Sequence, residues 1–292
     1  MKSRDNRDFF YMKKIKKFIL VKSIGMYINL MSYARPEKAT RLAYRFFSEP
    51  RLGRLSRNSL PPVLQDAVIE TTAINGGEFQ TYVWKGNDNV ILLVHGWESN
   101  ASRWELMLPH LRSSGSTIVA IDGPAHGLSG GKEFNVPAYA EFIDATVQKY
   151  KPSHLIGHSL GGAACIYYQY KYQNKGIQKM VILGAPSDLQ ILVRNYVTLL
   201  RMNSRIVSLL EQHFVDKFKF RIDEFSGKLF GSALNIKGII AHDVDDSVVS
   251  FEEGRKIAGS WKHARFIETK GLGHSMHDDS LYRKVTDFLG EK

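Results

Sequence analysis

The chain has 292 residues and a formal net charge of +11, with 43% hydrophobic and 24% charged residues. This length and composition are those of a globular protein with a large core, organised as one α/β domain with an insertion. Its single cysteine, Cys165, excludes an internal disulfide framework and a cysteine-rich zinc site.

The positive charge is confined to the start of the chain. Residues 1–60 contain 15 Lys and Arg against 4 Asp and Glu, whereas the rest of the chain contains 25 of each kind. This distribution argues against a strongly cationic active site that selects anionic substrates. It indicates an N-terminal arm suited to contact an acidic surface.

Residues 1–33 combine lysines with apolar side chains, and three interpretations remain open. They form an amphipathic helix that lies on anionic lipid, or a helix whose apolar face packs on the protein body, or a signal peptide. Lys22 interrupts the apolar region and disfavours the signal peptide, and the uncharged stretch from Ser23 to Ala34 is too short to cross a bilayer. We expect a cytoplasmic protein, with contact to an anionic membrane through residues 1–33 as an open alternative. No nucleic-acid partner is expected, because no binding motif accompanies the charge.

A second short helix is predicted from Pro36, followed by a basic loop that ends at Pro61-Pro62. The predicted division of the chain is therefore a basic helical arm at residues 1–62 and a second domain at residues 63–292. Within that domain, residues 187–235 are expected to form a mostly helical insertion.

From residue 67 onward, strand-like and helix-like segments alternate. The runs 67–74 and 78–84 flank Asn75-Gly76-Gly77, which is a hairpin signal. Further strands are predicted at 90–94, 117–121, 154–156, 180–183, 236–241 and 264–269, and helices at 104–111, 136–150, 162–172, 251–258 and 279–289. Alternation with apolar strands predicts a mostly parallel, doubly wound sheet covered on both faces.

The segment Gly157-His158-Ser159-Leu160-Gly161 has the form G-x-S-x-G between a predicted strand and a predicted helix. A nucleophilic serine on a sharp turn needs neighbours without side chains, because Cβ atoms at Gly157 and Gly161 would crowd the packed strand and helix. The pattern alone is weak, since a Gly-rich turn can also hold a structural serine.

A serine hydroxyl needs a base, and the base needs an orienting acid. Candidates for both follow later strands, at the edge where a doubly wound sheet holds its ligands. Asp243, Asp245 and Asp246 follow the strand 236–241, and His274 follows the strand 264–269. The order Ser159, Asp246, His274 is that of the α/β-hydrolases.

Four blocks extend this pattern: Leu92-Leu93-Val94-His95-Gly96-Trp97, Asp122-Gly123-Pro124-Ala125-His126-Gly127-Leu128-Ser129, Gly157-His158-Ser159-Leu160-Gly161-Gly162, and Gly271-Leu272-Gly273-His274 with the acidic loop before it. With them the chain resembles the serine-type α/β-hydrolase superfamily, in particular bacterial hydrolases in which a helical segment precedes the domain. The resemblance covers roughly residues 63–292 and leaves the arm and the insertion outside its strong part.

The resemblance implies an α/β-hydrolase fold with Ser159 as nucleophile, His274 as base and Asp246 as acid. It implies that the backbone N–H groups of Trp97 and Leu160 form the oxyanion hole, and that residues 187–235 form a lid. His95, Asp122 and His126 are then structural. The implied reaction is hydrolysis of a carboxylic ester or thioester with an apolar part, without cofactor or metal.

Several alternatives remain open. Asp243 is the second candidate for the acid, and His277 competes with His274 for the base. The loop departs from the family pattern, which often has Gly in place of Asp243 and Pro in place of Ser250. A metal site could be built from the His and Asp residues between 242 and 279. The same triad could serve an acyltransferase, a peptidase or a perhydrolase, or the fold could belong to a non-catalytic membrane-associated protein.

Overall fold

The computed structural model describes residues 2–74 and 77–291, and for residues 2–15 and 17 it describes the backbone alone. The predicted turn at Asn75-Gly76 lies outside the described residues. The chain divides into two compact units, and we describe each by itself. The helical unit comprises residues 1–48 and 189–225, and the sheet unit comprises residues 49–188 and 226–292.

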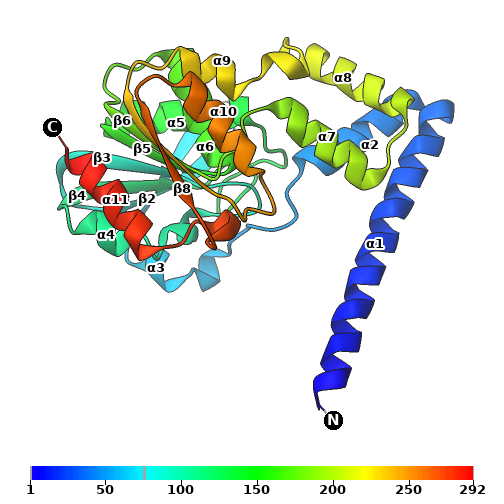
Figure 1. Cartoon of the computed structure of the whole chain (residues 1–292), viewed down its shortest axis with the longest axis horizontal. Coiled ribbons are helices and arrows are strands. Elements are labelled where there is room, and N and C mark those ends of the chain that lie inside the picture. The colour runs from blue at the N-terminus through cyan, green and yellow to red at the C-terminus, as the bar shows by residue number, and fades with distance from the viewer. Residues whose placement is uncertain (1, 75–76, 292) are drawn as a thin grey trace. The chain divides into compact units, whose positions relative to one another are not determined.

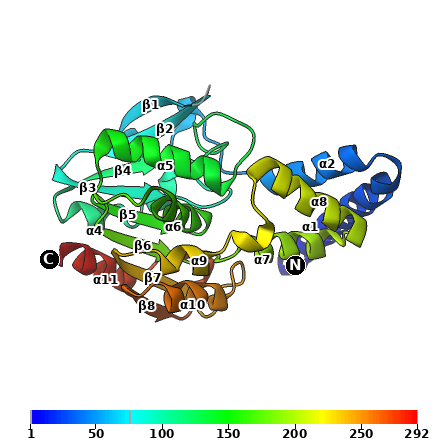
Figure 2. The ribbon, with the colours of Figure 1, turned by 90° about the horizontal axis from the view of Figure 1, so that it is seen from above.

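The sheet unit is built on one eight-stranded sheet (Figures 1 and 2). Its strands are β1 (Val68–Ile74), β2 (Gly77–Trp84), β3 (Asn87–Val94), β4 (Ser116–Ile121), β5 (His154–His158), β6 (Lys179–Leu183), β7 (Lys237–Asp243) and β8 (Ala264–Thr269). They lie in the order β1-β2-β4-β3-β5-β6-β7-β8. The pairs β1–β2 and β2–β4 are antiparallel, and every other pair is parallel. The predicted mostly parallel sheet is confirmed.

Helices cover both faces of this sheet. The principal ones are α4 (Leu108–Arg112), α5 (Val136–Tyr150), α6 (Leu160–Tyr172), α10 (Phe251–Ser260) and α11 (Asp279–Gly290). One face packs against α4 and α11, where Leu111 and Val285 share a core with strand residues such as Leu93. The opposite face carries α5, α6 and α10 (Figure 2). Because both faces are covered, β5 is buried along its whole length, including the histidines at its two ends.

Shorter elements complete the sheet unit: α3 (Pro62–Gln65), α9 (Gly227–Ser232) and the 3₁₀ turns η1 (Arg57–Ser59), η2 (Ala101–Trp104) and η4 (Gly273–Ser275). The helix predicted over 104–111 is instead divided between η2 and α4. Pro109 accounts for the division, because a proline lacks the N–H needed inside a helix and is tolerated in its first turn.

The helical unit joins the start of the chain to the insertion. Its elements are α1 (Lys2–Ala34), α2 (Pro36–Ser48), α7 (Leu189–Leu200), α8 (Ser204–Phe218) and the 3₁₀ turn η3 (Ile222–Glu224). Ile28 of α1, Tyr44 of α2 and Phe214 of α8 belong to one buried cluster. One face of α1 therefore packs on the insertion helices.

Close approach of α1 to α7 depends on a glycine. A Cβ at Gly25 would lie 1.7 Å from the carbonyl oxygen of Leu200. Asn29 reinforces this contact, because its side chain donates to the carbonyl of Arg201 and accepts from the amide of Asn203. The two distant segments thus form a specific packed interface.

The units do not divide at residue 62 as in the predicted organisation. Residues 49–62 belong to the sheet unit, because Leu55 packs against its core and Arg54 donates to the carbonyl of Gly131. The insertion is helical, as the sequence predicts, and its role as a lid stays a prediction. Among the described residues, no helix is both long enough and apolar enough to span a membrane.

Candidate active site

Ser159 stands on a strained turn between β5 and α6. Its backbone has φ 53° and ψ −127°, in a region that residues with a side chain rarely adopt. A Cβ at Gly157 would lie 2.6 Å from Cα of Gly162, and one at Gly161 would lie 2.2 Å from the carbonyl oxygen of Val94. Only glycine fits at these two positions, so strand and helix pack closely and hold the serine at the turn.

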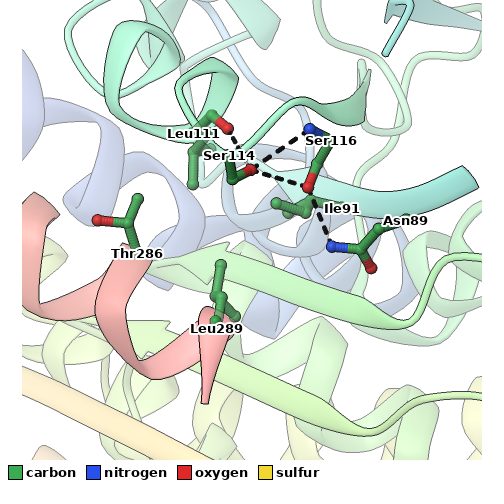
Figure 3. Close-up of a pocket in the computed structure, with 8 residues that line it drawn as sticks. Asn89, Ile91, Leu111, Ser114, Ser116, Thr286 and Leu289 are labelled. Carbon is green, nitrogen blue, oxygen red and sulfur yellow. Dashed lines mark hydrogen bonds between the residues drawn. The ribbon is translucent and has the colours of Figure 1, made fainter. Parts of the chain in front are cut away.

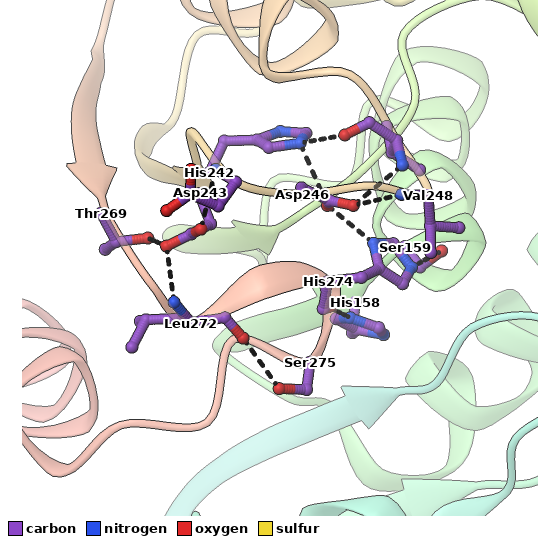
Figure 4. Close-up of polar contacts among 12 residues, drawn as sticks. His158, Ser159, His242, Asp243, Asp246, Val248, Thr269, Leu272, His274 and Ser275 are labelled. Atoms are coloured by element: carbon purple, nitrogen blue, oxygen red, sulfur yellow. Dashed lines mark hydrogen bonds and ion pairs between the residues drawn. The ribbon is translucent and has the colours of Figure 1, made fainter. Parts of the chain in front are cut away.

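Three side chains from separate strand ends form one hydrogen-bonded chain (Figure 4). Nε2 of His274 lies 3.0 Å from Oγ of Ser159, and Nδ1 of His274 lies 2.8 Å from Oδ2 of Asp246. Since a carboxylate can only accept, Nδ1 carries the proton and Nε2 is free to accept one from the serine. The predicted residues Ser159, Asp246 and His274 are thus brought together after β5, β7 and β8.

Asp246 is buried and fully hydrogen-bonded. Its Oδ1 accepts from the amides of Val248 and Val249 at 2.8 and 2.9 Å, and its Oδ2 lies 3.4 Å from Nε2 of His242 in addition to His274. Burial raises the pKa of this carboxyl, but the hydrogen bonds from His242, His274 and the two amides outweigh it and hold the pKa far below its ordinary range. Asp246 is therefore ionised and directs its charge at His274.

The two competing residues face other partners. Asp243 accepts from the amide of Asp245 on Oδ1, and from the hydroxyl of Thr269 and the amide of Leu272 on Oδ2. It therefore ties β7 to the loop after β8 (Figure 4). His277 contacts the hydroxyl of Tyr282 through Nδ1 and lies 3.5 Å from Arg103 through Nε2. The structure thus joins Asp246 and His274, rather than Asp243 and His277, to Ser159.

The turn after β3 lies directly against the serine. A Cβ at Gly96 would meet Cβ of Ser159 at 2.7 Å and its Oγ at 3.3 Å. Trp97 follows on this turn, and Leu160 begins α6, where first-turn amides have no acceptor inside the helix. Of the two predicted donor residues, Leu160 is therefore next to the serine in the chain, and Trp97 lies on the turn that packs against the serine.

Comparison with known proteins agrees with this fold. The family model described as alpha/beta hydrolase fold matches residues 89–219. The putative lipase of Acinetobacter baumannii superposes with a TM-score of 0.61 at 14% identity, covering 80% of this chain and 98% of its own. An esterase from Rhodococcus superposes with a TM-score of 0.58 at 17% identity, covering 77% and 99%.

The chain has the α/β-hydrolase fold.

Curated relatives of this chain are remote in sequence. It is 23% identical to a bifunctional esterase/perhydrolase of Acinetobacter calcoaceticus, over 64% of this chain and 85% of the relative, and 24% identical to phospholipase YtpA of Bacillus subtilis, over 62% and 67%. It is 27% identical to a monoacylglycerol lipase of Mycolicibacterium smegmatis, but that match spans only 38% of the lipase and 34% of this chain. The chain is a hydrolase enzyme.

Buried histidines hold the loops around the site through hydrogen bonds. His95 donates from Nδ1 to the carbonyl of Gly96 and accepts on Nε2 from the amide of Gly123, and burial lowers its pKa to about 4. His126 accepts from the amide of Glu98, and burial lowers its pKa to about 4 as well. Asp122 accepts from the amides of Ala101 and Leu128 and from the hydroxyl of Tyr82. Each of the three predicted structural residues has such a network.

Three residues for which the sequence predicts no role beside the triad support the site. Nε2 of His158 donates to the carbonyl of His274 at 2.7 Å, and Arg103 donates to the carbonyl of Ser275 at 2.8 Å. His242 donates from Nε2 to the carbonyl of Val249 at 3.0 Å. The position of His158 inside the G-x-S-x-G pattern was a usable signal, whereas Arg103 acts from a distant loop that no motif marks.

A cavity of about 150 Å³ is present elsewhere in the sheet unit and is shown in Figure 3. It lies beside the starts of β3 and β4, whereas Ser159 follows the end of β5. Its polar side chains satisfy one another, because Ser114 donates to Ser116 and Asn89 also donates to Ser116. This cavity therefore offers no reactive group.

The His and Asp residues considered for a metal have separate partners. Asp243 and Asp246 belong to the two networks given above, and Asp278 caps α11 by accepting from the amide of Leu281. Within the described ranges, no three His, Cys, Asp or Glu side chains are grouped as a metal-ligand set.

Proposed function

We propose that this α/β-hydrolase cleaves a carboxylic ester or thioester with an apolar part, through an acyl-enzyme on Ser159. The observation that carries the proposal is the hydrogen-bonded chain from Ser159 through His274 to Asp246, set on a strained turn. A serine in this setting loses its proton to the histidine as it attacks, and the carboxylate stabilises the imidazolium that forms.

In the first half-reaction, Oγ of Ser159 bonds to the carbonyl carbon of the ester while its proton moves to Nε2 of His274. Negative charge gathers on the former carbonyl oxygen, where the N–H groups of Trp97 and Leu160 stabilise it. The tetrahedral intermediate collapses when the bond to the leaving oxygen or sulfur breaks. That atom takes the proton from His274, and the acyl group stays on the serine.

In the second half-reaction, water adds to the acyl carbon and gives its proton to His274. Collapse of the second intermediate breaks the bond to Oγ, which recovers the proton. Asp246 keeps its charge throughout, because its hydrogen bonds hold its pKa far below neutrality. No cofactor or metal is needed for either half.

The preference for an apolar substrate rests on the surroundings of the serine and on the relatives. The half-buried Trp97 packs edge-on against Phe134 and His126, with ring centroids 5.6 Å apart in both pairs. Trp97 belongs to the turn whose Gly96 lies against the serine, and aromatic groups favour an acyl or alkyl chain over a charged group. The names of the relatives, a monoacylglycerol lipase and a phospholipase among them, support the same class.

The test is covalent labelling by a fluorophosphonate probe, which reacts with activated serines. We expect the intact protein to be labelled, Ser159→Ala to be unlabelled, and His274→Ala to be labelled at least a hundredfold more slowly. Hydrolysis of p-nitrophenyl esters of increasing acyl length then measures the apolar preference. Absence of labelling in the intact, folded protein would overturn the proposal.

A second candidate concerns the acceptor alone. A relative that aligns over 85% of its length is named an esterase/perhydrolase, so hydrogen peroxide is an alternative to water in the second half-reaction. Product analysis of one ester with and without peroxide separates the two, because peroxide yields a peracid and water a carboxylic acid.

A further inference from the structure

The α1 helix exposes large apolar side chains on the side away from the core of the helical unit. Ile19, Met26, Tyr27, Leu30 and Tyr33 are between 57% and 68% exposed. We call these five residues the α1 stripe. Such exposure is unusual for so many large apolar residues in sequence proximity, and contiguous apolar patches mark interaction sites.

Helical spacing places the α1 stripe on one face. Ile19, Met26 and Tyr33 follow one another at seven-residue intervals, which is two turns of a helix, and Leu30 lies between the last two on the same side. Ile28 points the opposite way, into the core shared with the other helices of the unit. The α1 helix therefore has two apolar faces, and only one of them is used inside the helical unit.

The same unit carries the whole net charge of the protein. By sequence the helical unit contains 18 Lys and Arg against 7 Asp and Glu, which gives +11, whereas the sheet unit contains 22 of each. Lys16, at the N-terminal end of the α1 stripe, is exposed. An apolar helix face on a strongly basic body is the combination that binds anionic lipid surfaces.

We propose that the α1 stripe docks the protein on an anionic membrane surface. The apolar residues enter the interface between headgroups and acyl chains, with the two tyrosines at the level of the headgroups, as amphipathic rings prefer. The basic residues of the helical unit contact the lipid phosphates. A second copy of the chain is a poorer occupant, because it would bring another charge of +11 against the first.

The first experiment measures sedimentation of the full-length protein with vesicles. One set contains phosphatidylcholine with about a third phosphatidylglycerol, and the other contains phosphatidylcholine alone. The test variant combines Ile19→Ser, Met26→Ser and Leu30→Ser. The control is Leu106→Ser, because Leu106 is 57% exposed on the neutral sheet unit. We expect the intact protein and the control to bind anionic vesicles, and the triple variant to bind at least tenfold more weakly.

The second experiment tests the charge. Lys16→Gln is expected to weaken binding to anionic vesicles about fivefold, as is typical of one basic residue near a lipid surface. Lys262→Gln, at an exposed site on the sheet unit, should leave binding unchanged. Raising the salt concentration should weaken binding by the intact protein. If binding is unchanged both in Lys16→Gln and at high salt, the proposal is overturned.

Two further outcomes would also overturn it. One is undiminished vesicle binding by a triple variant that circular dichroism shows to be folded, or by the single variant Leu30→Gln if the triple variant misfolds. The other is a dimer, seen by light scattering and lost in the variants, without vesicle binding. The proposal stands apart from the reaction at Ser159, because Ser159→Ala is expected to bind vesicles like the intact protein.

Discussion

Nε2 of His242 lies 3.4 Å from Oδ2 of Asp246, the same oxygen that accepts the hydrogen bond from His274. His242 is fully buried on β7, and its Nε2 also faces the carbonyl of Val249. Since both facing atoms are acceptors, Nε2 carries the proton. The imidazole therefore fixes both ends of the loop that presents the carboxylate to His274.

This relationship predicts a positioning role for His242. His242→Leu removes the donor and should lower kcat for ester hydrolysis about tenfold or more with little change in KM, because a hydrogen bond to a charged group is lost. His242→Gln can still donate from its amide and should recover much of the rate. If Leu and Gln variants lose the same activity while remaining folded, the ring serves packing alone.

Substitution of Asp246 should mainly lower catalytic activity, whereas substitution of Asp243 should mainly lower stability. Asp246→Asn removes the charge facing His274 and is expected to lower kcat by about 10³–10⁴-fold, with a folded protein as judged by circular dichroism. Asp243→Asn weakens the bonds to Thr269 and Leu272 and should lower the melting temperature. A larger kcat loss in Asp243→Asn than in Asp246→Asn would reverse the assignment of the acid.

The site was predictable because its residues are local to recognisable strand ends. Ser159 is marked by its glycines, and Asp246 and His274 follow segments that the sequence predicts as strands of the same sheet. The supporting contact from Arg103 to the carbonyl of Ser275 joins loops 172 positions apart. No spacing in the sequence indicates such a contact, because it forms only where two distant segments meet in the folded chain.

The organisation of the helices was less predictable for the same reason. The start of the chain and the insertion each show apolar periodicity. Such periodicity predicts a helix with an apolar face, but it does not indicate which element packs against that face. Ile28 and Phe214 share one buried cluster although 186 positions separate them. Gly25 belongs to no motif in the sequence. The need for glycine at this position is explained only by the carbonyl of Leu200, which lies beside it in the structure.

Substitution by alanine should change the free energy of unfolding in opposite directions at two helical glycines. Gly161→Ala places a Cβ 2.2 Å from the carbonyl of Val94 and is expected to lower the free energy of unfolding by about 2 kcal/mol or more. Gly259→Ala, in α10, meets no atom within 4 Å and should raise it by about 0.5–1 kcal/mol. Urea denaturation measures both. Equal effects would contradict the close packing of α6 on the end of β3.

The buried histidines predict that the sheet unit loses stability as the pH falls below about 6.5. Burial lowers the pKa of His95, His126 and His154 to about 4, from an ordinary value of 6.5. Between these values the unfolded chain binds protons that the folded protein excludes, so the stability is complete above about pH 6.5 and is lost as the pH falls toward 4. The carboxyl of Asp246 has a lowered pKa and loses its contribution only at still lower pH.

Urea denaturation followed by tryptophan fluorescence measures this effect in the sheet unit, because all four tryptophans lie there. Each excluded proton contributes about 1.4 kcal/mol per pH unit to the slope of the free energy of unfolding. His126→Gln should lower the stability at pH 7. It should also reduce the slope of the free energy of unfolding against pH by about 1.4 kcal/mol per pH unit, the contribution of one excluded proton. The slope is measured between about pH 6 and 4.5, which lie about half a unit inside the two pKa values. An unchanged slope in that variant would show that His126 is protonated in the folded protein, and its hydrogen bond from the amide of Glu98 could then not form.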